Sequence, residues 1–580
     1  MKKNVEWLCV WLAVVVVVVA ATPVYGQRWG RPHSYGRSKA STVGSSGIGI
    51  VSETSKAEVD GSGTFMASAE ADAGDTKAKV MAMTTDGAAQ GSSTASMSGA
   101  GEMVMTEVSG DGMLTGEAKG SSSTASATAD GGDDNDLRAS AVGSGNTVSA
   151  FSDGADMNRV EAVAHGDDNK VEASASLGAT MNRVYAVARG EGNTVFAQAS
   201  KTATMNDVDA VARGDGNTVI ALAFFGVDMN DVDAVARGEG NSVRVTAEFE
   251  ANMNHIDAAA RGDGNTVTAT AAGEADMNHI DAVARGDGNT VTATAAGEAN
   301  MNHIDAVARG DGNTVTATAE AVADMNHIGA VARGDENTVA AEAYLNANMN
   351  DVGAVARGDD NNLVRADASQ NATMNDVDAV ADGNGNTVTA AAFLDATMND
   401  VDAVARGDNN KVRASAYSNA DMNEFGAVAR GEGNTVKASS YENVVDNRVE
   451  AQAEGNRNDV TAETEESDRN RLSAMARGNR NDVTVKAKKS DRNRLRAMAR
   501  GNRNNATVET EESDRNRISA MARGNRNDVT VKAKKSDRNR LRAMARGNRN
   551  VVTVKAKKAE GVVRPVLVRG NGRSKTVDVP

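Results

Sequence analysis

The sequence predicts an all-β protein, a two-sided parallel β-solenoid of eighteen rungs, each rung formed by one repeat of about 23–24 residues. Three observations support this prediction. A frame with Asn at its first position, Gly eight residues later and Asn eleven residues later recurs from Asn135 to Asn550. Apolar residues alternate with polar ones between these markers, which is the period of a β-strand. No proline lies between Pro32 and Pro565 to interrupt a backbone ladder.

The N-terminal residues 1–26 are typical of a secretory signal peptide. Two lysines precede an uncharged run at residues 7–21, and small residues stand ahead of a cleavage point before Gln27. A transmembrane anchor is the alternative, but the run is short for a bilayer. The single cysteine, Cys9, lies inside this segment. We therefore expect a secreted chain without disulfides, with no membrane association once the signal is removed.

The remaining chain divides into four parts. Residues 27–134 are rich in Ser, Ala, Gly and Met and are interpreted as irregular rungs or as a low-complexity lead-in. Residues 135–446 hold repeats with Met before the opening Asn, and residues 447–558 hold repeats with Arg in that place. Residues 559–580 are expected to cap the open end of the ladder.

Each repeat is expected to form two strands joined by a glycine turn. In the repeat that opens at Asn278, one strand places Ile280, Ala282 and Ala284 on one face. The second strand places Val291 and its alternate alanines on the corresponding face. Glycines between the strands permit positive φ. A coil stacks Asn on Asn and Ala on Ala, so that amide ladders and close sheet packing both result. Insertions are expected only in the loop after the second strand.

The charges of the late repeats support coiling with a fixed register. Three acidic positions alternate with three basic positions from one repeat to the next: Glu463, Glu465, Glu466; Lys486, Lys488, Lys489; Glu509, Glu511, Glu512; Lys532, Lys534, Lys535. In a parallel stack each Glu lies between Lys neighbours, whereas a slip by one unit would set like charges together.

The turn motif Gly286-Asp-Gly-Asn289-Thr-Val291 resembles the curlin repeat of secreted amyloid-type fibres, with Ala where curlin repeats carry Gln. The whole chain, a signal peptide followed by Ala-, Gly- and Asn-rich repeats, resembles the repetitive structural proteins of molluscan shell matrix and some cross-β silks. The first resemblance implies coil geometry. The second implies a secreted structural role in a mineralised or fibrous material.

Composition and charge exclude several functions. Aromatic residues make up 3% of the chain, so any core is built from small side chains. No Ser/His/acid or Cys/His constellation and no phosphate-binding loop is present, which predicts a non-enzyme. The formal net charge of −16 argues against nucleic-acid binding.

Acidic residues form a column at the turn, and such carboxylates suit calcium, a hard cation that prefers oxygen ligands. The candidate metal ligands are Asp215, Asp263, Asp287, Asp311, Asp335, Asp359 and Asp408. A second acidic column holds Asp209, Asp233, Asp257, Asp281, Asp305, Asp378 and Asp402. A solvated turn face is the alternative, and no cofactor other than weakly bound calcium is predicted.

Other repeated side chains leave further alternatives open. Four histidines, His255, His279, His303 and His327, share one position and suit zinc or copper. Threonines in three neighbouring repeats, from Thr266 to Thr318, resemble the flat arrays of ice-binding solenoids. Arg-Gly-Asp occurs seven times, which suggests cell attachment. The arginine columns of the late repeats suit sulfated polysaccharide.

The sequence thus predicts a structural repeat protein of an extracellular organic matrix, that of a calcified shell. Its charged ladders would contact matrix proteins, polysaccharide, mineral or calcium, and its rods would associate end to end. The alternatives are a ligand-binding solenoid, for ice or for cell adhesion, and a silk or fibre protein.

Overall fold

A computed structural model provides the structure of the chain. The described residues are 37–43, 47–51, 54–60, 63–72, 79–85, 88–98, 103–109, 113–121, 124–131, 134–143, 145–153, 157–176, 181–200, 205–224, 231–248, 255–272, 275–276, 279–296, 299–300, 303–320, 323–324, 327–344, 351–358, 362–369, 376–393, 400–417, 424–443, 445–535, 538–557, 561–563, 567–569 and 574–578. Side chains are described mainly between residues 124 and 557. The predicted signal peptide, residues 1–26, lies outside the described residues.

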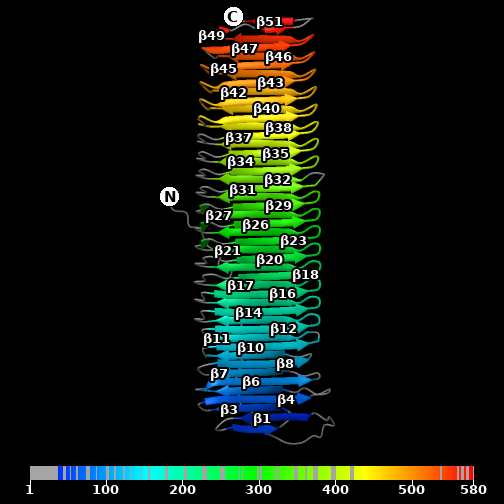
Figure 1. Ribbon diagram of the computed structural model, residues 1–580, viewed down its shortest axis with the longest axis vertical. Helices are drawn as coiled ribbons and strands as arrows, with labels where there is room; N and C mark the ends of the chain where they lie inside the picture. The colour runs from blue at the N-terminus through cyan, green and yellow to red at the C-terminus, as the bar shows by residue number, and fades with distance from the viewer. Residues whose placement is uncertain are drawn as a thin grey trace. The chain divides into compact units, whose positions relative to one another are not determined.

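Every regular element among these residues is a β-strand, and through the eighteen repeats the long strands alternate along the chain between two sheets (Figure 1). The first sheet contains β1 (Arg37–Val43), β4 (Gly63–Asp72), β6 (Ala88–Ser98), β8 (Met113–Ser121), β10 (Asp134–Val142), β12 (Met157–His165), β14 (Met181–Arg189), β16 (Met205–Arg213), β18 (Asp231–Arg237), β20 (His255–Arg261), β23 (His279–Arg285), β26 (His303–Arg309), β29 (His327–Arg333), β31 (Asp351–Arg357), β33 (Asp376–Asp382), β35 (Asp400–Arg406), β37 (Glu424–Arg430), β39 (Arg448–Glu454), β41 (Arg471–Arg477), β43 (Arg494–Arg500), β45 (Arg517–Arg523), β47 (Asn539–Arg546), β49 (Gly561–Val563) and β50 (Leu567–Arg569).

The second sheet contains β2 (Gly47–Val51), β3 (Thr54–Asp60), β5 (Lys79–Thr85), β7 (Met103–Ser109), β9 (Thr124–Asp130), β11 (Thr147–Asp153), β13 (Lys170–Ser176), β15 (Thr194–Ser200), β17 (Thr218–Phe224), β19 (Ser242–Glu248), β21 (Thr266–Ala272), β24 (Thr290–Ala296), β27 (Thr314–Glu320), β30 (Thr338–Tyr344), β32 (Leu363–Ser369), β34 (Thr387–Phe393), β36 (Lys411–Tyr417), β38 (Thr435–Tyr441), β40 (Asp459–Glu465), β42 (Asp482–Lys488), β44 (Asn505–Glu511), β46 (Asp528–Lys534), β48 (Val551–Lys557) and β51 (Ser574–Asp578). A small third sheet contains β22 (Ala275–Asp276), β25 (Ala299–Asn300) and β28 (Ala323–Asp324).

The strands pair in parallel with the equivalent strand of the next repeat. Ile280 lies opposite Ile304 in the first sheet, and Val291 lies opposite Val315 in the second. Among the described strands only β1 with β4 and β2 with β3 pair antiparallel. Each of the eighteen repeats supplies one strand to each sheet, from β10 and β11 to β47 and β48. The predicted fold class, a two-sided parallel β-solenoid, is confirmed.

The core consists of the predicted inward positions. Ile280, Ala282, Ala284 and Val291 are fully buried, and the same pattern continues in one cluster through the described repeats. Burial of each Val or Ile side chain contributes about 1.5–3 kcal/mol, and the small alanines between them keep the interior close-packed. The alternation of buried and outward residues follows from the two-residue strand period.

The turn between the two strands is held by glycine conformation and by an asparagine ladder. Gly286 has φ +128° and Gly288 has φ +65°, both in the range that favours glycine. The turn asparagine Asn289 is buried; its backbone N–H donates to Oδ1 of Asn313 at 2.7 Å, and its Nδ2 donates to the carbonyl of Gly286 at 2.6 Å. The predicted amide ladder is therefore present at this corner.

The expectation that insertions fall only in the loop after the second strand is wrong for one repeat. The repeat that contains β31 and β32 carries its extra residue in the turn, between Gly358 and the ladder residue Asn362. Asn362 is buried and occupies the ladder position of this repeat, since its Oδ1 accepts the N–H of Asn337 at 2.8 Å. An extra residue inside a strand would turn every later side chain to the opposite face, whereas an exposed turn accommodates it.

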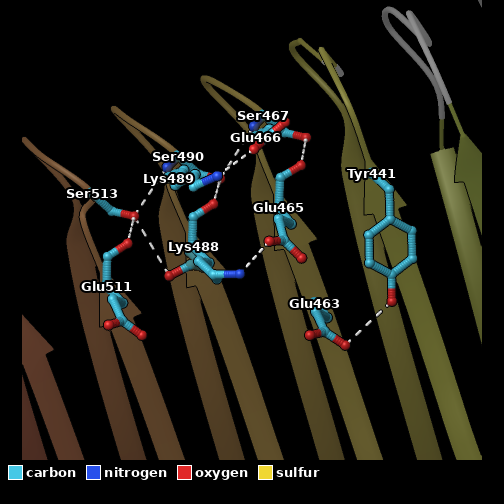
Figure 2. A network of polar contacts seen from close by, with 11 residues as sticks. Tyr441, Glu463, Glu465, Glu466, Ser467, Lys488, Lys489, Ser490, Glu511 and Ser513 are labelled. Atoms are coloured by element: carbon cyan, nitrogen blue, oxygen red, sulfur yellow. Dashed lines mark hydrogen bonds and ion pairs between the residues drawn. The ribbon is translucent and has the colours of Figure 1, made fainter.

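The alternating acidic and basic rungs are in the predicted register. Lys489 donates to Glu466 at 2.6 Å, and Lys535 donates to Glu512 at 2.7 Å. Figure 2 shows Lys488 reaching back in the same way to Glu465 on the neighbouring strand. These exposed pairs contribute little stability individually, so their main effect is on register.

The ends of the repeat array continue the same ladder. Strands β8 and β9 pair in parallel with β10 and β11, and the short strands β49, β50 and β51 pair with the last two strands of the repeats. The structure describes no helix long and apolar enough to cross a membrane within the described residues.

Candidate functional site

The carboxylates predicted to bind calcium lie on the exposed turns, where they accept hydrogen bonds from the backbone of the next rung. The backbone N–H of Asp287 donates to Oδ1 of Asp263 at 2.8 Å, and Asp311 donates in the same way to Asp287 at 2.8 Å. Asn384 accepts the equivalent bond from Asp408 at 2.7 Å, so an uncharged acceptor also serves. One carboxylate oxygen per rung is thus used in the ladder, which leaves the other for solvent or a cation.

The remaining members of this column follow the same geometry where they are described. Asp215 accepts the N–H of Glu239 at 2.7 Å, Asp311 accepts that of Asp335 at 2.8 Å, and Asp408 accepts that of Glu432 at 2.6 Å. Asp359 lies outside the described residues. Calcium contact at these carboxylates stays a prediction.

The second acidic column lies on the outward face of the first sheet and is half-buried between neighbouring strands. Burial raises the pKa of Asp233 and of Asp378 to about 7, with repulsion from adjacent Asp231 and Asp376 as the next cause. The pKa values of Asp209 and Asp402 are raised to about 6 for the same reasons. The strand pairing sets like carboxylates directly beside one another, as Asp209 is beside Asp233.

We predict that the chain is more stable in mildly acidic solution than in mildly alkaline solution. The folded-state pKa of Asp233 is above the unfolded value, so its favourable contribution is complete below about pH 4 and is lost as pH rises through about 7. The midpoint of thermal unfolding should therefore rise from pH 8 to pH 5. The change Asp233→Asn should reduce that rise, whereas Asp287→Asn on the exposed turn should leave it unchanged. A midpoint that falls between pH 8 and pH 5 would contradict this prediction.

The other repeated side chains are placed in columns as the sequence indicates. Thr268 lies beside Thr292, which lies beside Thr316, but Arg244 precedes this row and Ala340 follows it. The threonine array is thus limited to three adjacent rungs. The Arg-Gly-Asp triplets coincide with the glycine turn, where the Gly is required by its positive φ.

The late arginines line two grooves. One groove, of about 630 Å³, follows the turns and is lined by Arg457, Arg480, Arg503, Arg526, the asparagines beside them and one acidic residue, Glu432. These arginines have φ near +60°, at a turn position where most early repeats carry Gly and three carry Asp168, Glu336 or Asn409. A second groove, of about 660 Å³, crosses the outward face of β43, β45 and β47, between arginines and methionines.

The sequence interpretation missed an aromatic column and the titration of the second acidic column. Phe393, Tyr417 and Tyr441 stack on adjacent rungs, with ring centroids 5.1 and 5.2 Å apart. Lys437 lies 5.5 Å from the ring centroid of Tyr441. The repeat frame itself places these three rings at one position, so a column-by-column comparison of repeats would have found them.

These features define a class of protein: a repetitive β-solenoid of structural type that displays charged columns. The sequence matches no protein-family model and no curated protein.

Proposed function

We propose that this chain is a secreted structural protein of an extracellular organic matrix, that of a calcified shell, and acts by binding without catalysis. The observation that carries the proposal is the stacking of like charges in columns on an otherwise uniform ladder. Equivalent rungs offer the same groups at a regular spacing of about 4.8 Å, which suits repetitive polymers and mineral faces better than a single small ligand.

The charge of the first sheet changes along the stack. Its outward face is acidic in the earlier repeats, at Asp207, Asp209, Asp231, Asp233, Asp257, Asp281, Asp305, Asp351, Asp376, Asp378, Asp400 and Asp402. The same face is basic in the later repeats, at Arg471, Arg494, Arg496, Arg517, Arg540 and Arg542. This segregation supports two kinds of contact, with calcium or mineral at the acidic columns and with polyanions at the basic ones.

The turn groove is the stronger candidate for a matrix contact. Arg480, Arg503 and Arg526 make no ion pair among the described residues and are exposed. Guanidinium groups bind sulfate and carboxylate groups through paired hydrogen bonds. Positive φ costs a non-glycine residue about 1–2 kcal/mol, so these positions carry Arg at the expense of local stability. Arginine at these positions destabilises the turn, so a role in binding explains its presence better than a structural role does.

The resemblance to repetitive shell-matrix proteins is the reason for proposing that the extracellular material is a calcified shell. Secretion is supported by the N-terminal segment, and calcium or mineral contact by the exposed turn carboxylates such as Asp287. Sulfated polysaccharide and acidic matrix proteins are the partners proposed for the arginine groove.

The test replaces Arg480, Arg503 and Arg526 together by Gly, the residue that most early repeats carry at this turn position. We expect thermal stability to be equal or higher, because the positive φ is then unstrained. Binding to immobilised chondroitin sulfate should weaken by about tenfold or more, equivalent to about 1.4 kcal/mol. The wild-type affinity should also fall steeply as sodium chloride is raised.

The matched control replaces Arg285, Arg309 and Arg333 by Gln, which removes the same charge from early repeats outside the groove. This control should bind chondroitin sulfate as the wild type does. Equal affinity of the Gly variant and the wild type would show that the groove is not the binding surface. Proteomic recovery of the chain from a soft, uncalcified tissue would argue against a shell matrix.

A further inference from the structure

The four stacked histidines end at a place where the neighbouring acidic column is interrupted. His255, His279, His303 and His327 lie on adjacent rungs, with ring centroids 4.9, 4.8 and 4.7 Å apart. Each of the first three has Asp two residues later on the same face, as His303 has Asp305. The fourth, His327, has Gly329 in that place.

Gly329 leaves a notch beside the last histidine. A Cβ at Gly329 would overlap Oδ1 of Asp305 and would lie 3.9 Å from Nε2 of His327. The carboxylate of Asp305 therefore extends from the preceding strand over Gly329. Nε2 of His327 is near the same space. The Asp305 carboxylate also lies 3.2 Å from Nε2 of His303.

The earlier rungs lack this notch. Asp257 and Asp281 are followed by another Asp in the same column, and the Oδ1 atom of each is buried without a hydrogen-bond partner. Among the described residues, only beside Gly329 do the ligand atoms of one carboxylate and two imidazoles come together. Ligand atoms of His303, Asp305 and His327 all lie within 4.8 Å of one another.

A second carboxylate orients the last imidazole. Nδ1 of His327 lies 3.0 Å from Oδ2 of Asp351 on the next strand. A proton on Nδ1 donated to Asp351 leaves the lone pair on Nε2, near the notch. Metal-binding histidines commonly make this contact to a carboxylate through the ring nitrogen that does not bind the metal.

We propose that His303, Asp305 and His327 form a binding site for a divalent transition-metal ion such as Zn²⁺ or Cu²⁺, with water at the remaining positions. Two imidazoles and one carboxylate are ligands that these ions prefer over calcium. Ligand atoms around tetrahedral Zn²⁺ lie about 3.4 Å apart, so modest side-chain rotation at this exposed surface brings the three into place. Asp351 is a positioning residue for His327.

The experiment titrates the full chain, purified without a polyhistidine tag, with Co²⁺ followed by visible absorption. We expect one tightly bound ion per chain, displaced by Zn²⁺ and not by excess Ca²⁺. Affinity should fall as the solution is acidified, because protons compete with the metal ion for its ligand atoms. The change Asp351→Asn should weaken Zn²⁺ binding by about tenfold without moving the thermal midpoint.

Two glycine variants form the decisive pair. Gly329→Asp continues the acidic column as in earlier rungs, and it should abolish the Co²⁺ spectrum while the chain stays folded by circular dichroism. Gly353→Asp, one rung further on, adds the same charge where a Cβ meets nothing within 4 Å, and it should leave Co²⁺ binding unchanged. Retention of the spectrum by Gly329→Asp, or absence of the spectrum in the wild type, would overturn the proposal.

Discussion

The change Gly286→Ala is expected to destabilise the rungs on both sides of it by about 3 kcal/mol or more. A Cβ at this position would overlap the carbonyl oxygen of Gly262 on the preceding rung and would lie 2.5 Å from Oδ1 of Asp263. Both are held in the turn ladder, so neither can move away without breaking inter-rung hydrogen bonds such as that from Gly262 to the carbonyl of Arg285, at 2.8 Å. Positive φ at Gly286 adds a backbone cost for any other residue.

Gly288→Ala is the matched control, because it lies two residues away in the same turn. Gly288 also has positive φ, but a Cβ there would meet nothing within 4 Å. We expect a loss of only about 1 kcal/mol. Repeat proteins can unfold locally, so hydrogen exchange of residues 255–320 should be measured beside thermal unfolding. Equal exchange protection in the two variants would contradict the close approach of successive turns as the cause.

The parallel stacking of successive repeats could be predicted because the late repeats alternate in charge as well as sharing one spacing. Spacing alone is compatible with a meander of antiparallel strands. The alternation of Glu465 with Lys488 and then Glu511 is favourable only when equivalent positions lie on adjacent rungs, and the structure places them so. The strand period separates inward from outward residues, so it predicts that Ile280 and Ala282 lie in the core, and both are fully buried.

Other features depend on the exact stacking of neighbouring side chains and were not predictable from one repeat. The spacing of the frame places the turn asparagine of this repeat at position 361, whereas the structure uses the adjacent Asn362, so the extra residue lies before it and not in the later loop. The raised pKa of Asp233 results from burial between strands, which spacing does not show. The notch at Gly329 could not be predicted, because it depends on the direction of the Asp305 side chain, which extends toward the next rung.

Loss of one asparagine from the buried ladder is also expected to lower the free energy of unfolding strongly. The change Asn313→Ala tests this. Oδ1 of Asn313 accepts the N–H of Asn289 at 2.7 Å, and its Nδ2 donates to the carbonyl of Gly310 at 2.6 Å. Alanine leaves both partners in a buried corner without these bonds. Each unsatisfied buried group costs about 1–3 kcal/mol, so we expect a loss of about 3 kcal/mol.

The matched control is Asn502→Ala in the exposed ladder of the late turns. Its N–H donates to Asn479 at 2.7 Å, and its Oδ1 accepts the N–H of Asn525 at 2.7 Å. Only the second bond is lost on substitution, and water can replace it, so we expect a loss of less than about 1 kcal/mol. Urea unfolding followed by circular dichroism compares the two variants. Similar losses would mean that the ladder acts through stacking geometry alone. A much larger loss for Asn313 would show that burial of the amide is what makes the corner asparagine necessary in every rung.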